Sequence, residues 1–214
     1  MKTSGKIMLA MLFMVAFTSC KKDDVSANND ITTQINTFPN EPLSVEEIQS
    51  LKIMREEEKL AHDVYVSLFN KWNVNVFSNI SSSEQTHTNA ISTLLKKYNI
   101  ADPVGTNPFG VFTDTTLQAL YTALVAEGNK SVLNAFKVGA TIEDLDIYDL
   151  NNWDAKIDNQ DIKYVYQNLN KGSRNHMRSF YSQVVSAGGS YTPQFISQAE
   201  LDAIISTPKE TGSW

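Results

Sequence analysis

Four long stretches of this sequence combine helical periodicity with an absence of proline. All six prolines of the chain fall outside these stretches, so each stretch can form an uninterrupted helix. The first one opens with a capping box, in which Ser44 is followed three residues later by Glu47. The predicted helices run from Ser44 to about Asn70, from about Asn79 to Tyr98, from about Ser131 to Asn151 and from about Asn159 to Ala187. This pattern predicts an all-α fold.

The connections between these helices predict their arrangement. Residues 99–130 separate the second helix from the third and contain Pro103, Pro108 and a short amphipathic helix from Thr115 to Glu127. A helix of twenty residues is about 30 Å long, so a chain that starts a parallel helix must first travel back along the bundle. The other connections are short and suit antiparallel neighbours. We therefore expect a four-helix bundle with a long crossover between helices 2 and 3.

Polar side chains interrupt the apolar stripe near the middle of every predicted helix. Glu58, for example, occupies a stripe position between Met54 and Tyr65. The interrupting residues are Glu58, Glu84, His87, Glu143, Asp146, Ser173 and His176. Because all of them lie near the centres of their helices, a bundle would bring them together at one level.

Burying this set of side chains requires a compensating charge. A carboxylate taken from water into an apolar core costs several kcal/mol, and helix bundles avoid it unless a cation is present. None of the interrupting residues is a lysine or an arginine. A pair of divalent metal ions would supply the missing positive charge, and Glu84 with His87 forms a Glu-x-x-His pair of the kind found in bundles that hold two metals.

Three motifs resemble those of the ferritin-like superfamily, and in particular its rubrerythrin branch. They are REEEKLAHDVY around Glu58, SSSEQTH ending at His87, and ATIEDLD around Glu143. Within the superfamily, the chain is similar to a bacterial and archaeal family that is known only as a ferritin-like domain of unknown function. The resemblance implies that Glu58 is a ligand, Glu84 a bridging carboxylate and His87 a terminal nitrogen ligand. It also implies that Glu143 is a metal ligand and, as one of two alternatives, that Asp146 is one.

The fourth helix departs from the pattern of the superfamily. A second Glu-x-x-His motif is expected there, but the sequence reads Ser173-Arg174-Asn175-His176. One metal would therefore lack a bridging carboxylate, or would take Asp146 or water instead. Asp146 has a second interpretation, as a hydrogen-bond partner of a ligand histidine. His176 is interpreted as a ligand in preference to a core histidine, because its level matches the other sites.

Three residues next to the predicted ligands have simpler interpretations. His62 lies four residues after Glu58 at the edge of the stripe, and we favour a surface histidine or a partner of a ligand over an additional ligand. Tyr65 and Tyr166 fit best as core aromatic residues whose hydroxyl groups could reach the site.

The ligand set favours particular metals and reactions. Carboxylate and imidazole ligands suit iron or manganese and tolerate zinc, while a chain without a suitable thiolate disfavours copper(I). Two iron ions that react with oxygen or peroxide would give ferroxidase or peroxidase-like activity. The competing interpretation is a non-enzymatic module that sequesters metal or binds a partner and holds one metal or none. The missing glutamate at Ser173 supports this alternative.

The amino-terminal residues predict export and attachment to a membrane. A basic start, the apolar run IMLAMLFMVAF and the small residues before Cys20 resemble a lipoprotein signal, with residues 1–19 removed and Cys20 carrying the lipid. Residues 20–42 are polar and are expected to form a disordered tether. We therefore expect a lipoprotein of the outer membrane in the cell envelope, held there by its lipid alone. The net charge of −6 argues against nucleic-acid binding.

The rest of the chain is expected to form one domain and an extension. Residues 43–187 are long enough for a single bundle with its own core. Residues 188–214 begin after a pair of glycines and contain a predicted short helix from Ser197 to Ile205.

Overall fold

The computed structural model describes residues 31–212, and all regular secondary structure in this range is helical. The predicted all-α class is thus confirmed for the described residues. The helices are α2 (Val45–Trp72), α3 (Asn75–Lys97), α4 (Thr115–Gly128), α5 (Val132–Asp154), α6 (Gln160–Ser186) and α7 (Gln198–Ile205), and residues 31–37 are also helical. The second long helix begins at Asn75, one turn before the predicted Asn79.

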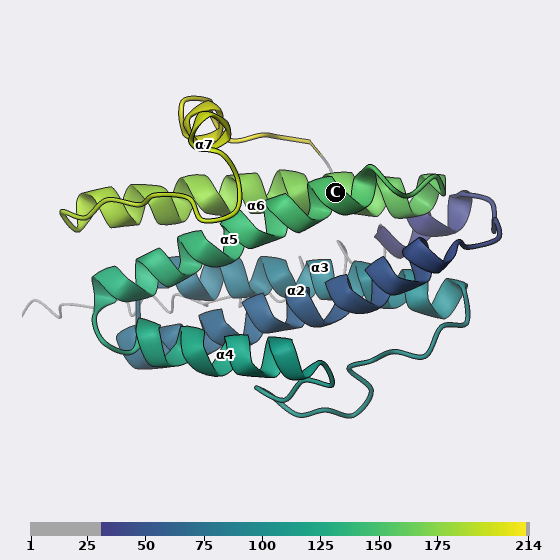
Figure 1. The fold of residues 1–214 in the computed structure, drawn as a ribbon, viewed down its shortest axis with the longest axis horizontal. Coiled ribbons are helices and arrows are strands. Elements are labelled where there is room, and N and C mark those ends of the chain that lie inside the picture. Colours follow the sequence, from purple (N-terminus) through teal and green to yellow (C-terminus); the bar gives the residue numbers. More distant parts are fainter. Residues whose placement is uncertain (1–30, 213–214) are drawn as a thin grey trace, which may run out of the picture.

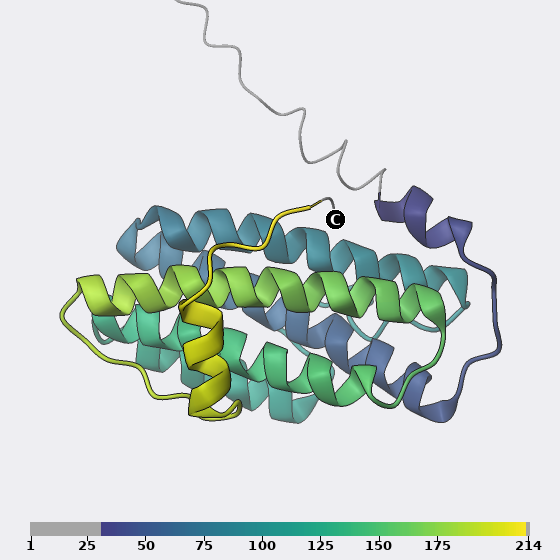
Figure 2. The same cartoon turned by 90° about the horizontal axis from the view of Figure 1, so that it is seen from above.

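The four long helices lie side by side in two layers (Figure 1). One layer pairs α2 with α3, and the other pairs α5 with α6. Additional contacts of α2 with α5 and of α3 with α6 close the arrangement, so that each long helix has two long neighbours. Helix α4 packs outside α2 and α5, and α7 packs on the outer side of α6 (Figures 1 and 2). The segment between α3 and α5 runs back along the molecule, so α3 and α5 point in the same direction (Figure 1).

The start of α2 is fixed by the predicted capping box, which also ties two helices together. The Glu47 backbone N–H donates to Ser44 Oγ over 3.1 Å, and the Ser44 N–H donates to Glu47 Oε2 over 2.8 Å. The second oxygen of Glu47 accepts hydrogen bonds from the backbone N–H groups of Asp158 and Asn159, just before α6. One buried carboxylate therefore holds the first turn of α2 against the start of α6.

Residues 31–37 form a helix where the sequence predicted part of a disordered tether. Ile31 and Ile35 are spaced one turn apart, and both are buried against the core. The ammonium group of Lys97 donates hydrogen bonds to the carbonyl oxygens of Ile35, Phe38 and Pro39. A cation at these carbonyls stabilises the carboxyl end of a helix. Two isoleucines and one lysine from α3 thus order a segment whose composition is otherwise that of a linker.

The hydrophobic core consists of two separate clusters. One contains Leu51 and Met54 of α2 and Leu94 of α3, and the other contains Tyr65 and Leu68 of α2 with aromatic residues of α3, α5 and α6. Between the clusters, every long helix places polar side chains in its interior face. A buried polar layer therefore lies between the two clusters, near the middle of the four long helices, as the interrupted stripes predicted.

The predicted signal segment of residues 1–19 and the predicted lipid-bearing Cys20 lie outside the described residues. Within residues 31–212, no helix combines the length and the apolar character that crossing a membrane requires.

Candidate metal centre

Six side chains with metal-binding groups meet in the buried layer. Glu58 comes from α2, Glu84 and His87 from α3, Glu143 and Asp146 from α5, and His176 from α6. All six are at least nine-tenths buried, and His176 is the most exposed of them at 8%. The structure therefore places all six predicted ligands in one buried layer, with five of them joined by ion pairs and Asp146 outside these pairs.

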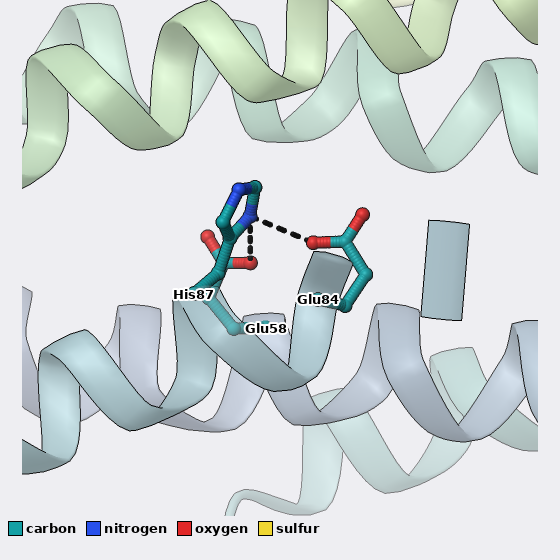
Figure 3. A group of neighbouring side chains, drawn as sticks. All are labelled: Glu58, Glu84 and His87. Carbon is teal, nitrogen blue, oxygen red and sulfur yellow. Dashed lines mark hydrogen bonds and ion pairs between the residues drawn. The ribbon is translucent and has the colours of Figure 1, made fainter. Parts of the chain in front are cut away.

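Glu84 occupies the centre of this group, because its two carboxylate oxygens face two different histidines. Glu84 Oε2 lies 2.8 Å from His87 Nδ1, and Glu84 Oε1 lies 2.8 Å from His176 Nδ1. His87 Nδ1 is also 3.1 Å from Glu58 Oε2. Figure 3 shows these three side chains of α2 and α3 pointing into the space between the helix layers. Glu58, Glu84 and His87 form a first triad of potential ligands, whose ligand atoms lie within 4.8 Å of one another.

A second triad shares Glu84 with the first. It consists of Glu84, Glu143 and His176, with His176 Nδ1 3.4 Å from Glu143 Oε2. The other nitrogen of His176, Nε2, lies 3.0 Å from Ser83 Oγ, and this contact fixes the side of the ring that faces the carboxylates. The rings of His87 and His176 stack with their centroids 5.5 Å apart. The two triads thus lie next to each other, with one histidine and one unshared glutamate in each.

The spacing of these atoms fits ligands of a common ion. Two ligand atoms about 2.1 Å from one ion and at right angles lie about 3.0 Å apart. The histidine–glutamate separations in the two triads are 2.8, 3.1, 2.8 and 3.4 Å, close to this value. Several of the atoms have no hydrogen bond of normal geometry among the described residues, although they are buried. These atoms are Glu58 Oε1, both oxygens of Glu84, Glu143 Oε2, Asp146 Oδ2 and His176 Nδ1. The Glu84 oxygens, Glu143 Oε2 and His176 Nδ1 take part in ion pairs within the group. Glu58 Oε1 and Asp146 Oδ2 have no hydrogen-bond partner among residues 31–212, and a bound cation would satisfy such buried oxygens.

Comparison with known proteins places the chain in a family. Residues 47–208 match the family described as uncharacterized protein domain DUF2202. The chain belongs to this family. The predicted membership of a family of unknown function is thereby confirmed, while its relation to ferritins remains a prediction.

One relative and its crystal structure are similar over most of their length. The uncharacterized protein MJ0754 of Methanocaldococcus jannaschii is 54% identical over 178 residues, which cover 83% of this chain and 96% of that protein. A crystal structure of the hypothetical protein MJ0754 from Methanococcus jannaschii matches with a TM-score of 0.79 at 55% identity, covering 80% of this chain and 98% of that chain. Neither name assigns an activity.

The charges in the candidate metal centre shift one another's pKa values strongly. Burial alone would raise the pKa of Glu84, but the charges of His176 and His87 outweigh it and lower this pKa. Burial would lower the pKa of His176, but Glu84 and Glu143 raise it to about 9. Burial raises the pKa of Glu58 to about 7, against the opposing effect of His87. Without metal, the site is therefore rich in protons, with both imidazole rings charged next to Glu84.

Asp146 lies beside the triads and is not a member of either. Burial raises its pKa well above the ordinary value, followed by the charges of Glu58 and Glu143. Asp146 is one helical turn from Glu143 on the same face of α5. The carboxyl group of Asp146 is therefore close enough to Glu58 of the first triad and Glu143 of the second for their charges to raise its pKa.

The three consecutive glutamates of α2 are all buried, and each has a different environment. Glu56 accepts hydrogen bonds from the backbone N–H groups of Thr113 and Asp114 and so holds the start of α4. Glu57 faces α5, and burial together with the charge of Asp149 raises its pKa to about 8. Glu58 faces α3 and the site. The sequence distinguished Glu58 by its helical phase, but the burial of its two neighbours depends on α4 and α5 and was missed.

The remaining predicted residues differ in their relation to the site. Tyr65 is a buried core residue whose hydroxyl donates a hydrogen bond of 2.5 Å to Glu143 Oε1, so its hydroxyl reaches the site. The hydroxyl of Tyr166 donates to Ser50, two turns before Glu58, which leaves Tyr166 as a core residue. His62 Nδ1 contacts Asp63, on a half-buried edge of α2. Ser173 is buried, and its hydroxyl donates to the carbonyl oxygen of Leu169 within α6.

Gly172 is a site residue that sequence reasoning missed. A Cβ atom at this position would lie 2.6 Å from His87 Nε2 and 2.7 Å from His87 Cε1. Real Cβ atoms do not approach other atoms so closely, so the ring of His87 fits against α6 only because residue 172 has no side chain. A lone glycine inside a polar helical stretch gives no signal of this role before the packing of α3 on α6 is known.

We expect Gly172→Ala to displace His87 and weaken the first triad. Alanine normally stabilises a helix interior by about 1 kcal/mol relative to glycine, so a loss of stability would identify the clash. Overpacking of this kind costs about 1–3 kcal/mol. Thermal unfolding together with metal content measures both effects. A variant that is more stable than the wild type and keeps its metal would show that His87 does not depend on this space.

Proposed function

We propose that the protein is a ferritin-like metal-binding protein of the cell envelope with a centre of two iron or two manganese ions. In this proposal, α2, α3, α5 and α6 form the ferritin-like four-helix bundle, and the segment containing α4 is its crossover. The observation that carries the proposal is the position of Glu84, whose two oxygens each pair with a different histidine. A carboxylate placed in this way suits a bridge between two ions.

The two triads assign the ligands of each ion. Glu58 and His87 would bind one ion, Glu143 and His176 would bind the other, and Glu84 would bind both. The fourth helix lacks the second bridging glutamate, because Ser173 stands at that position. Asp146, which is close to both unshared glutamates, is the residue that we propose in its place.

The ligand set supports redox chemistry. Carboxylate and imidazole ligands suit iron and manganese, with zinc as a third candidate, and a bound pair of iron ions would supply electrons to oxygen or peroxide. Tyr65 would orient Glu143 through its hydrogen bond, since burial and the charge of Glu143 keep the phenol protonated by raising its pKa. The surrounding apolar clusters would exclude bulk water from the reacting groups. Ferroxidase or peroxidase-like activity is the function that we propose.

Anaerobic titration with ferrous iron tests the proposal. We expect two ions per chain in the wild type and release of protons on binding, because the histidines must lose theirs. The variant His62→Gln is a matched control, since His62 lies outside both triads, and it should also bind two ions. A wild-type protein that binds one ion or none would instead support a non-enzymatic module that sequesters metal or binds a partner.

The location in the cell envelope has its own test. If Cys20 carries a lipid, the change Cys20→Ser should release the protein from the membrane fraction, because the anchoring chains would be absent. Fractionation of cells that express either form, followed by immunoblotting, measures this directly. Membrane association that persists in the Cys20→Ser variant would refute the proposed anchor.

A further inference from the structure

The carboxyl-terminal segment of residues 206–212 passes over α6 (Figure 2), and α6 holds one glutamate of this segment with two arginines. Arg174 donates to both carboxylate oxygens of Glu210, over 2.7 Å from Nε to Oε1 and over 2.5 Å from Nη2 to Oε2. Arg178 Nη1 lies 3.2 Å from Glu210 Oε1. A bidentate pair of arginine and carboxylate is strong, and it fixes the relative orientation of the two groups. The hydrogen bonds from Arg174 also lower the pKa of Glu210, so its carboxylate is charged at neutral pH.

Further contacts fix the backbone of the carboxyl-terminal segment. Asn175 Nδ2 donates to the carbonyl oxygen of Glu210 over 2.9 Å, and the Glu210 N–H donates to Asn175 Oδ1 over 2.9 Å. Thr207 accepts hydrogen bonds from Arg178 through both its carbonyl oxygen and its hydroxyl group. The last residues of a domain are usually poorly ordered unless specific contacts hold them. Here α6 holds both the charged side chain and the backbone of the segment.

The residues that hold the segment surround His176 in the sequence. Arg174 and Asn175 lie two residues and one residue before His176, and Arg178 lies two residues after it. Successive residues of a helix point about 100° apart, so one turn can face two neighbours. His176 points to Glu84 of the candidate metal centre, whereas the other three side chains point to the carboxyl-terminal segment. The segment therefore fixes, from outside, the turn of α6 that presents His176 inside.

This turn of α6 follows a weak point in the helix. Gly172 and Ser173 stand side by side just before it, and sharp bends in helices concentrate at glycine–serine pairs. Ser173 Oγ donates to the carbonyl oxygen of Leu169, four residues earlier, and a hydrogen bond of this kind destabilises and bends helices. Helix α6 nevertheless continues from Gln160 to Ser186. Neighbouring groups therefore have to support the helix at this pair.

Arg174 supplies such support, because it connects the two sides of the glycine–serine pair. Its Nη1 donates to Asn170 Oδ1 over 2.8 Å, while its other two nitrogens bind Glu210. Asn170 in turn donates to Asn151 of α5 over 2.7 Å. An arginine side chain has many rotamers, and holding it in a single one costs conformational entropy. Glu210 selects the rotamer that reaches Asn170, so the contact across the weak point depends on the carboxyl-terminal segment.

We propose that Glu210 is a positioning residue for His176. By fixing the turn of α6 around His176, the carboxyl-terminal segment keeps this ring in place beside Glu84 and Glu143. The inference rests on the proposed function, in which His176 binds one of two metal ions. The ion of the second triad then depends on the segment. The ion of the first triad does not, because all ligands of that triad come from α2 and α3.

The first test uses the metal-free protein. Glu210→Ala should release Arg174 and loosen α6, so the backbone amides of residues 174–178 should exchange with deuterated water about tenfold faster than in the wild type. Glu127→Ala is the matched control. It removes another carboxylate that is paired with a cation, Lys130, but neither of these two residues belongs to α6, so exchange at residues 174–178 should not change. Wild-type exchange rates in Glu210→Ala would overturn the proposal.

The second test distinguishes a positioning role from general support of the fold. In anaerobic titration with ferrous iron, Glu210→Ala should weaken the binding of one ion about tenfold and leave the other ion at its wild-type affinity. Adding Ser173→Ala should restore the weakened ion, because alanine removes the competing hydrogen bond and favours the helix. Equal weakening of both ions, or no recovery with Ser173→Ala, would contradict positioning through α6. Glu210→Gln keeps the shape of the side chain and is the milder replacement if Glu210→Ala unfolds.

The two tests separate this inference from the proposed function. If the wild type binds two ferrous ions and a folded Glu210→Ala variant binds both with unchanged affinity, the positioning role is wrong and the metal centre stands. If the wild type binds no second ion, the proposed two-metal function fails, whatever the exchange rates of α6 show.

Discussion

Replacing Glu84 with glutamine is expected to remove both metal ions, whereas replacing Glu58 or Glu143 removes only one. Glu84 is common to both triads, while the other two glutamates each belong to one. Glutamine keeps the shape of the side chain but loses the negative charge that both ions and both histidines require. We expect the affinity of both sites to fall by more than about a hundredfold. Metal analysis after dialysis against a fixed concentration of ferrous iron gives the number of ions for each variant.

Glu57→Gln is the matched control for this series. Glu57 is a buried glutamate adjacent to Glu58, but it belongs to neither triad, so this variant should keep two ions. A Glu84→Gln variant that keeps one ion at full affinity would show that the two triads do not share a bridge. Retention of two ions would remove Glu84 from the ligand set and with it the main argument for a two-metal centre.

Helical periodicity was sufficient to predict the long helices and the residues that meet between them. The pattern works because each helix buries one face, so a carboxylate such as Glu58 in that face is visible as an exception. The capping box at Ser44 was readable for a similar reason, since its partners lie within one turn. The predictions that succeeded depend on short-range spacing within a single helix.

The features that were missed depend on contacts between distant parts of the chain. Gly172 matters because the ring of His87 packs on it from another helix, and Glu57 is buried because α4 and α5 cover it. Residues 31–37 have the composition of a linker and become helical through Lys97, about sixty residues away in the chain. No local pattern contains this information, because the stabilising partner is supplied only by the folded structure.

The metal-free protein is expected to lose stability as the pH rises from about 5 to 9. The pKa of Glu57 is raised from 4.5 to about 8, that of Glu58 from 4.5 to about 7, and that of His176 from 6.5 to about 9. The folded state therefore binds more protons than the unfolded state throughout this range, and the free energy of unfolding must fall as the pH increases. The lowered pKa of Glu84 acts in the opposite direction, but only below pH 4.5. The total loss should be on the order of several kcal/mol.

Bound metal should reverse the fall in stability with rising pH, because the metal ions replace the protons that the buried carboxyl groups and histidines hold in the metal-free protein. Ligands bind metal in their deprotonated form, so the increase in melting temperature caused by ferrous or manganous ion should be larger at pH 8 than at pH 5.5. Thermal unfolding at several pH values, with and without metal under anaerobic conditions, measures both curves. Glu57→Gln should flatten the metal-free curve in part, since it removes one of the buried titrating groups. An increase in stability of the metal-free protein between pH 5 and 9 would contradict this prediction. It would mean that the buried carboxyl groups are charged in the folded state without metal, so that they need no bound cations to compensate them.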